Sequence, residues 1–244
     1  MRPANFWPEL QVEYVLKNTS FFYFRNHYRF NFDDANNYLG EKGLTESLER
    51  VQVRAGYEQV FNNQWSLGIA ESYAKEQTRG IFFNEVYARH ISTFGKIRFA
   101  QRASFEHILR WPTNNNGRIR FRADLEQNIN VGKRLIRPRL SYDLFYNISY
   151  QNPKGPNIAQ RLVDRTRLRL EVLYNFNERF SATPYFTEQV DFTGKAPEYS
   201  AAGEIIKPAS KQNAHTPIVG LDLRYVLFHG GEPFPRTLPS HSSK

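Results

Sequence analysis

The chain has 244 residues, a formal net charge of +9 and a hydrophobic fraction of 40%, and this length predicts one domain or at most two small ones. It contains no cysteine, which excludes a disulfide scaffold, a thiol nucleophile and a thiolate metal site. No apolar run approaches the roughly 18 residues of a spanning helix, so a helical membrane protein is also excluded. The opening residues, MRPANFWPEL, lack the apolar segment of a secretory leader, so we expect a cytosolic chain or one whose leader has been removed.

Alternation of apolar and polar residues recurs along the chain and predicts strands, because successive side chains of a strand point to opposite faces. The alternation is weak over 9–16, 65–76, 82–92 and 179–192 and clear over 21–32, 50–61, 97–110, 117–131, 136–148, 165–174 and 219–227. Several of these segments are about twice the usual globular strand of about 5–6 residues. No amphipathic helix is evident, so we expect an all-β fold with eleven readable strands.

The predicted connections alternate in length. Short ones at 62–64, 93–95, 132–134 and 176–178 are interleaved with longer ones at 77–81, 111–116, 151–160 and 193–213. Long strands joined in this way are typical of outer-membrane barrels, which have short periplasmic turns and long extracellular loops. We therefore predict an antiparallel up-and-down transmembrane β-barrel in the bacterial outer membrane. Because bacterial single-chain barrels have even strand numbers, we expect about 12 strands, with 10 as the alternative.

Soluble β-sandwiches and lipocalin-like barrels also have alternating strands, with the apolar face turned inward. Two features favour the membrane barrel. The strands are long, and Arg outnumbers Lys by 23 to 10, which suits buried ion pairs better than a solvated face. The same interleaving of basic and acidic residues on one face argues against a nucleic-acid partner, which needs a continuous basic stripe.

The polar faces of the predicted strands would line the lumen of such a barrel. The residues with this placement that we expect to form an ion-pair network or an anion-binding surface are Arg98, Arg102, Glu106, Arg118, Arg120, Arg122, Asp124, Glu126, Arg137, Arg139, Asp143, Arg165, Arg167, Arg169 and Glu171. One hypothesis is a lumen filled by arginine–carboxylate networks. The other is a narrow anion-preferring path that uses the surplus of positive charge. Both predict that a double reversal of Arg120 and Glu126 is tolerated better than either single change.

The segments FWPELQVEYVL, FFYFRNHYRF, ERVQVRAGYEQVFNNQWSLGIAESY, RIRFRADLEQNI and RTRLRLEVLY together resemble an uncharacterised family of Gram-negative outer-membrane β-barrels, classed as a domain of unknown function. The resemblance extends over most of residues 6–228. It implies a barrel in the outer membrane in contact with its lipids, and it implies no established activity. The last strand, VGLDLRYVLF, also resembles the C-terminal assembly signal of such barrels.

We expect one barrel domain over residues 1–228, followed by a flexible tail over 229–244 that is rich in Pro, Gly and Ser. The long loops 33–48, 151–160 and 193–213 could carry a surface function. A barrel with a closed lumen would suit a structural or accessory subunit of an outer-membrane complex, and this is the function we favour.

An outer-membrane lipid hydrolase is the enzymatic alternative. His90 and Ser92 lie two residues apart on one predicted strand face, and Gln101 on the next strand could orient the histidine. The position near a short turn and the absence of other phospholipase motifs argue against catalysis. The remaining histidines have no metal-site spacing, and we expect neither a metal nor another cofactor.

Overall fold

The computed structural model describes residues 3–32, 47–76, 79–111, 115–131, 134–149, 163–195, 197–200, 205–208 and 210–229. Nearly all of these residues are in strands. No helix in these ranges is long and apolar enough to cross a membrane.

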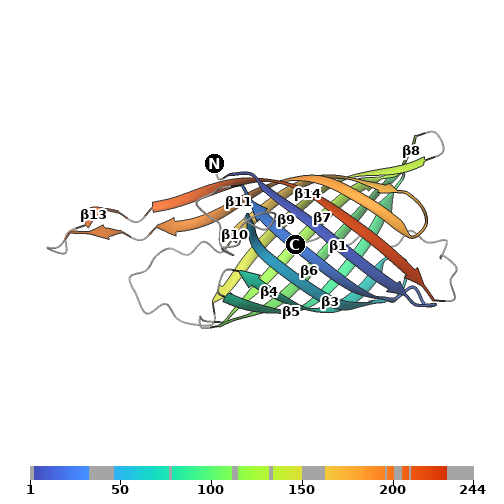
Figure 1. The fold of residues 1–244 in the computed structure, drawn as a ribbon, viewed down its shortest axis with the longest axis horizontal. Helices are drawn as coiled ribbons and strands as arrows, with labels where there is room; N and C mark the ends of the chain where they lie inside the picture. The colour runs from blue at the N-terminus through green and yellow to red at the C-terminus, as the bar shows by residue number, and fades with distance from the viewer. Residues whose placement is uncertain are drawn as a thin grey trace.

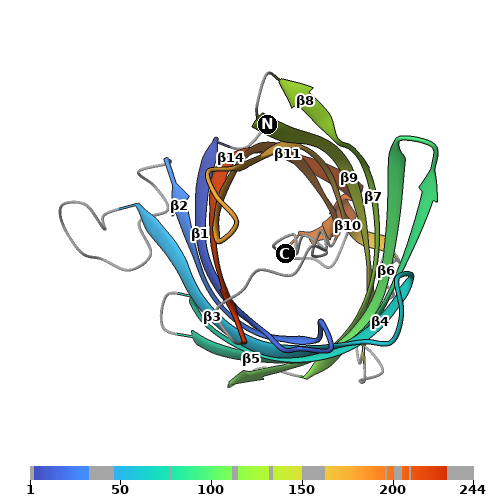
Figure 2. The ribbon, with the colours of Figure 1, turned by 90° about the vertical axis from the view of Figure 1, so that its right-hand side faces the viewer.

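Eleven long strands close into one barrel (Figures 1 and 2). They are β1 (Asn5–Val15), β2 (Phe21–Asn31), β3 (Leu48–Val60), β4 (Trp65–Glu76), β5 (Arg79–Phe94), β6 (Ile97–Trp111), β7 (Asn116–Gln127), β9 (Arg134–Ser149), β10 (Val163–Asn175), β11 (Phe180–Lys195) and β14 (Ser210–Phe228). Each segment predicted from the alternation corresponds to one of these strands. The all-β barrel is therefore confirmed.

The sheet has twelve strands, but only eleven close the barrel, because the short strand β8 (Ile129–Val131) pairs with β9 alone among the described strands. The expectation that an even number of strands, all antiparallel, closes the barrel was therefore wrong. β1 and β14 pair in parallel, in a register that runs from Asn5 opposite Ile218 to Val15 opposite Phe228. The other neighbouring barrel strands are antiparallel. An odd number of alternating strands leaves the first and last pointing the same way, so the barrel can close only through a parallel pair.

The segment 193–213, expected to be a long loop, is largely a β-hairpin. β11 and β14 stay paired as far as Lys195 and Ser210, and the short strands β12 (Glu198–Tyr199) and β13 (Ile205–Lys207) continue the hairpin beyond the rim (Figure 1). The predicted loop 151–160, most of the loop 33–48 and the tail after His229 lie outside the described residues.

The predicted strand over 117–131 is interrupted at Asn128 and resumes as β8 (Ile129–Val131), which pairs with the start of β9. The register on both sides of the interruption places Pro138 opposite Gln127. Proline has no N–H to donate, so the backbone ladder breaks there. The Asn128 side chain accepts a hydrogen bond from Arg137 Nε instead, at 2.8 Å.

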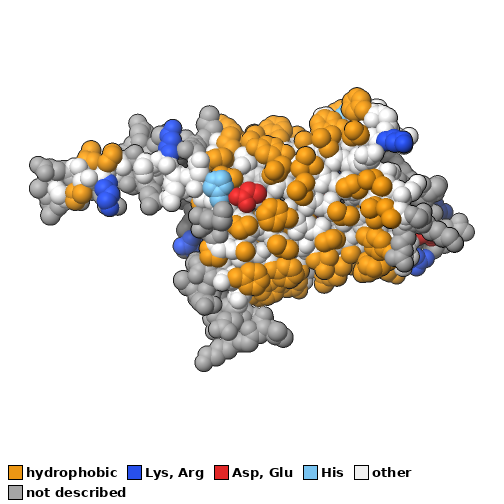
Figure 3. Space-filling model, turned by 90° about the horizontal axis from the view of Figure 1, so that it is seen from above, with side chains coloured by type: hydrophobic (Ala, Val, Ile, Leu, Met, Phe, Trp, Pro, Cys, Tyr) orange, Lys and Arg blue, Asp and Glu red, His pale blue; other side chains and the backbone are white. Residues whose placement is uncertain are grey.

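The two faces of the barrel wall have opposite character. Exposed apolar side chains cover the outside as a broad belt (Figure 3); Phe24, Phe121 and Leu170 are 53%, 52% and 55% exposed. The inside holds the buried charges, and Arg120 and Glu58 are among the most completely buried side chains. This distribution is the reverse of that in a soluble barrel, whose apolar face points inward.

Three inward glycines make room for tyrosine rings on the neighbouring strand. The pairs, directly opposite each other in the register, are Gly56 with Tyr23, Gly68 with Tyr87, and Gly220 with Tyr185. A Cβ atom on each glycine would lie within 2.5 Å of a tyrosine ring atom, so no larger residue fits without moving the ring. The glycines therefore allow the tyrosines to lie flat against the inner wall.

Apolar side chains gather inside the barrel at the end with the short turns. Val15, Phe21, Val60 and Val226 form a buried cluster there with Tyr23 and Ala70, and Phe228 packs against it. On β6, β7 and β9, by contrast, the charged side chains of Arg98, Glu126 and Arg137 lie near the same end.

Candidate functional site

The candidate site is the charged lumen. All the lumen residues predicted from the sequence lie on inward faces, and all but Arg167 are in an ion pair with a described residue. The alternation placed these side chains correctly. Their functional role stays a prediction.

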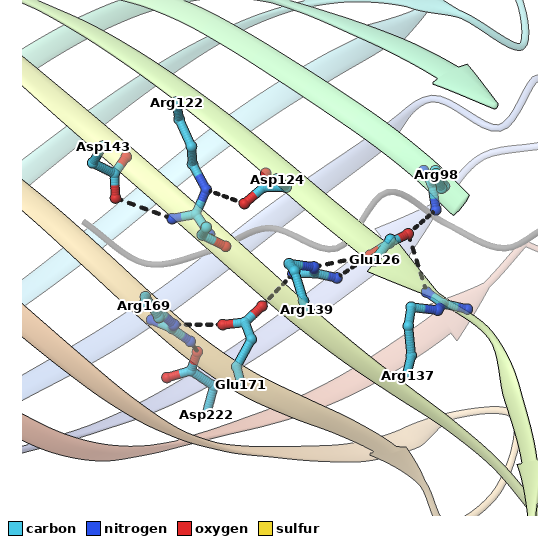
Figure 4. Close-up of polar contacts among 11 residues, drawn as sticks. Arg98, Arg122, Asp124, Glu126, Arg137, Arg139, Asp143, Arg169, Glu171 and Asp222 are labelled. Atoms are coloured by element: carbon cyan, nitrogen blue, oxygen red, sulfur yellow. Dashed lines mark hydrogen bonds and ion pairs between the residues drawn. The ribbon is translucent and has the colours of Figure 1, made fainter. Parts of the chain in front are cut away.

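A continuous chain of ion pairs crosses from β6 through β7, β9 and β10 to β14 (Figure 4). Its members, with nitrogen–oxygen distances, are Arg98–Glu126 (2.8 Å), Arg139–Glu126 (2.6 Å), Arg139–Glu171 (2.5 Å), Arg169–Glu171 and Arg169–Asp222 (2.5 Å). Arg137 lies 4.0 Å from Glu126. Each inner carboxylate of the chain therefore contacts at least two guanidinium groups, as planar arginine side chains allow.

A second group of contacts joins β7 to β9. Asp143 forms ion pairs with Arg120 at 2.7 Å and with Arg122 at 3.3 Å. Arg122 also contacts Asp124 at 2.7 Å and donates to Ser141 Oγ at 2.7 Å. Arg120 and Glu126, the two residues of the predicted double reversal, therefore have different partners among the described residues, and the tolerance of that reversal stays a prediction.

A third group lies on β3, β5 and β6. Glu85 contacts Arg54 and, at 2.8 Å, Arg102. Glu58 contacts Arg89 at 3.2 Å and accepts a hydrogen bond from the Tyr87 hydroxyl at 2.8 Å. The contacts of Glu85 with Arg54 and of Glu58 with Arg89 and Tyr87 join strands that are not adjacent, since β4 separates β3 from β5.

Glu85 and Arg89 were missing from the predicted lumen. Both are buried, at 2% and 5% exposure. The alternation of β5 is weak because its inward face begins with apolar Ile81 and Phe83, while polar Asn84 points outward. Reading every second residue back from Arg89 would have found Glu85.

Many of the inner guanidinium groups lie over aromatic rings. The Arg102 guanidinium carbon lies 3.8 Å from the Tyr87 ring centroid, and that of Arg169 lies 3.5 Å from the Tyr185 centroid. At these two places a glycine backbone, a tyrosine ring and a guanidinium form three successive layers, in which the ring face attracts the cation.

The described lumen contains small cavities. One of about 20 Å³ lies among Arg89, Arg102 and Glu126, and another of about 10 Å³ lies beside Glu9, Arg25 and His27. A water molecule needs about 10–15 Å³, so each cavity holds at most one or two waters. Arginine and carboxylate side chains fill the space around them.

The predicted hydrolase residues lie near the short-turn end of β5. His90 stacks on Trp65, with ring centroids 4.5 Å apart, and Gln101 is opposite it in the register. No hydrogen bond joins His90 to Ser92 or Gln101 within the described ranges. The hydrolase hypothesis stays a prediction. Among the described residues, no group of three or more His, Asp or Glu side chains could hold a metal ion.

Fold and site together define a class: a closed eleven-stranded β-barrel with an apolar outer wall and a lumen of arginine–carboxylate networks. A family model described as protein of unknown function (DUF2490) matches residues 4–199. The chain belongs to this family, and the resemblance to an uncharacterised family is confirmed. The match ends before β14, so it does not include the last strand. No curated protein matches the chain.

Proposed function

We propose that the chain is an integral β-barrel of the bacterial outer membrane, without enzymatic activity, whose lumen is sealed by ion pairs. We further propose that it is a structural or accessory subunit of an outer-membrane assembly. The observation that carries the proposal is the inverted distribution of side chains, apolar outside and charged inside. In water such an exposed apolar wall would be prone to aggregation, whereas the lipid of a bilayer solvates it. A bilayer also requires every backbone polar group to be hydrogen-bonded, which a closed barrel achieves.

The proposed orientation follows from the connections. The turns at 16–20, 61–64 and 176–179 lie at one end of the barrel, and the β11–β14 hairpin projects from the other (Figure 1). Outer-membrane barrels have short turns in the periplasm. We therefore place the projecting hairpin outside the cell.

The packing of the lumen supports a sealed barrel. Arg120, Glu58 and Glu106 are at most 1% exposed, and the cavities beside the networks are no larger than one or two waters. A wide water-filled pore would leave such side chains solvated.

The projecting hairpin supports an accessory role. Ile205 and Ile206 on β13 are 61% and 62% exposed, beyond the rim of the barrel. Exposed apolar side chains at a loop tip suit contact with another protein.

A narrow anion-preferring channel is the second candidate function, favoured by the arginine-rich lumen. Planar-bilayer recording of the purified barrel distinguishes the two. A sealed barrel gives no steady conductance, whereas a channel gives unitary currents with anion selectivity.

The membrane assignment is tested by fractionating cells that express the full chain. We expect the chain to stay in the outer-membrane fraction after a urea wash and to dissolve only in detergent. Unheated samples should migrate differently from boiled ones on a denaturing gel. Recovery as a detergent-free soluble protein would contradict the proposal. Purification from native membranes in mild detergent then tests the accessory role, since a subunit should copurify with a defined partner and an independent barrel should not.

A further inference from the structure

Three buried nitrogen atoms near the long-loop end of the lumen have no hydrogen-bond partner among the described residues. They are Trp7 Nε1, His27 Nε2 and Arg29 Nε. The three side chains are 4%, 4% and 9% exposed. Native proteins pair nearly all such groups with protein, water or a bound ion, so this group needs an explanation.

The three side chains lie together around one ring. The Arg29 guanidinium carbon lies 4.3 Å from the Trp7 ring centroid. The His27 ring meets the Trp7 ring edge-on, with centroids 5.6 Å apart. A second guanidinium, that of Arg167 on β10, lies 5.1 Å from the same centroid. Side chains from β1, β2 and β10 thus meet at the Trp7 ring.

The two guanidinium groups at Trp7 have no carboxylate partner in the described part of the chain. Arg29 makes neither a hydrogen bond nor an ion pair there, and Arg167 donates only to the neutral Gln189, at 2.7 Å. Nearby arginines differ in this respect. The pairs they form are Arg50–Glu76 (2.6 Å), Arg118–Glu106, Arg120–Asp143 (2.7 Å) and Arg165–Asp191 (2.5 Å).

Glu9 is the nearest carboxylate on the same face of β1, two residues after Trp7. It lies against Arg25, with Nε 3.0 Å from Oε1. Arg25 therefore balances its charge, and no carboxylate of the described residues forms an ion pair with Arg29 or Arg167. The cavity beside Glu9 and His27 has a volume of about 10 Å³, so the surrounding side chains must move apart to admit an oxyanion.

We propose that Trp7, His27, Arg29 and Arg167 bind a small oxyanion of the phosphate or sulfate type inside the lumen. A buried charge without a counter-ion is costly, and a water molecule would satisfy some N–H groups without offsetting either charge. An oxyanion does both, since its oxygens accept several charge-assisted hydrogen bonds. The site goes beyond the proposed structural role and does not depend on it.

Thermal unfolding of the purified barrel in detergent tests the site, followed by the change in gel mobility. Inorganic phosphate is compared with sodium chloride at equal ionic strength. At phosphate about ten times the dissociation constant, the unfolding midpoint should rise by about 3–5 °C. The key variants are Arg29→Gln, which breaks no ion pair with a described residue, and Trp7→Phe, which keeps an aromatic ring at this position and removes the indole N–H.

Both variants should lose most of the phosphate-dependent rise. The matched control is Arg79→Gln, because Arg79 is exposed at the same end of the barrel and its loss changes net charge equally; this variant should keep the full rise. The proposal is overturned if phosphate gives the wild type no advantage over chloride. It is also overturned if Arg29→Gln and Trp7→Phe respond like the control. Because the barrel's folding and membrane location are read separately, their failure would be distinguishable from failure of the site.

Discussion

Arg169 on β10 contacts Asp222 on β14, with Nη2 2.5 Å from Oδ2, although β11 lies between the two strands. The guanidinium passes over the ring of Tyr185 on β11, and that ring lies flat because Gly220 has no side chain. A glycine, a tyrosine and an arginine thus allow an ion pair to bridge three strands. Such bridges brace the barrel beyond its backbone hydrogen bonds.

Replacing Arg169 should destabilise the barrel strongly. Arg169→Met leaves Asp222 and Glu171 with one fewer counter-charge in a buried place, and loss of one partner of a buried pair costs about 3–5 kcal/mol. Urea titration in detergent, followed by gel mobility, measures the change. Arg169→Lys keeps the charge and should lose less. Equal stability of the Met variant and the wild type would contradict the bracing role.

The Tyr87 layer can be tested through Gly68. A Cβ at Gly68 would lie 2.2 Å from Tyr87 Cζ, so Gly68→Ala should displace the ring from Glu58 and Arg102 and cost about 1–3 kcal/mol. In a Tyr87→Ala background the same alanine meets no ring and should cost much less. A double-mutant cycle in urea measures this difference, and additive effects would show that the two residues do not interact.

The Arg120–Asp143 pair permits a charge reversal. Arg120→Asp or Asp143→Arg alone places like charges together in the lumen and should lower the yield of heat-modifiable barrel. The double variant restores opposite charges and should recover part of the yield. The reversal of Arg120 with Glu126 serves as the comparison, since these two residues have different partners. Equal behaviour of the two double variants would mean that specific pairing does not matter.

The outer wall gives a fourth prediction. Phe121→Arg places a charge on the outward face of β7, where a lipid-facing arginine costs about 2–4 kcal/mol at mid-membrane. Folding into lipid vesicles should therefore become less favourable, and Phe121→Leu should have little effect. In a soluble barrel the arginine would be harmless, because it would replace an apolar side chain exposed to water.

The strand pattern made much of the fold predictable. Alternation correctly predicted every barrel strand and the inward placement of the listed arginines, because the period of two fixes which face each side chain occupies. The alternation did not predict how many strands close the barrel or that β1 and β14 pair in parallel. Bacterial single-chain barrels have even strand numbers, and this rule led us to expect 12 or 10 strands. The loop lengths had already placed the start of the first strand at the long-loop end, which agrees with eleven strands.

The sequence also did not predict which charged side chains pair with each other in the lumen. Arg120 and Glu126 lie six residues apart on β7, about 20 Å along a strand, so they are too far apart to pair. Which carboxylate of β9 meets Arg120 depends on the register between β7 and β9, which periodicity leaves open. Glu85 was missed because apolar residues share its face on β5. The cluster at Trp7 was missed because its members come from β1, β2 and β10, and only the closed barrel brings these strands to one place.

The central claim is that the outer wall contacts lipid. The chain has no cysteine, so a single Leu170→Cys substitution on the outward face of β10 can carry a nitroxide spin label without further changes. Power-saturation spectroscopy in lipid vesicles then compares the label's collisions with oxygen, which partitions into lipid, and with a water-soluble nickel chelate. A membrane barrel predicts high accessibility to oxygen and low accessibility to the chelate, whereas a label that collides mainly with the chelate would contradict the account.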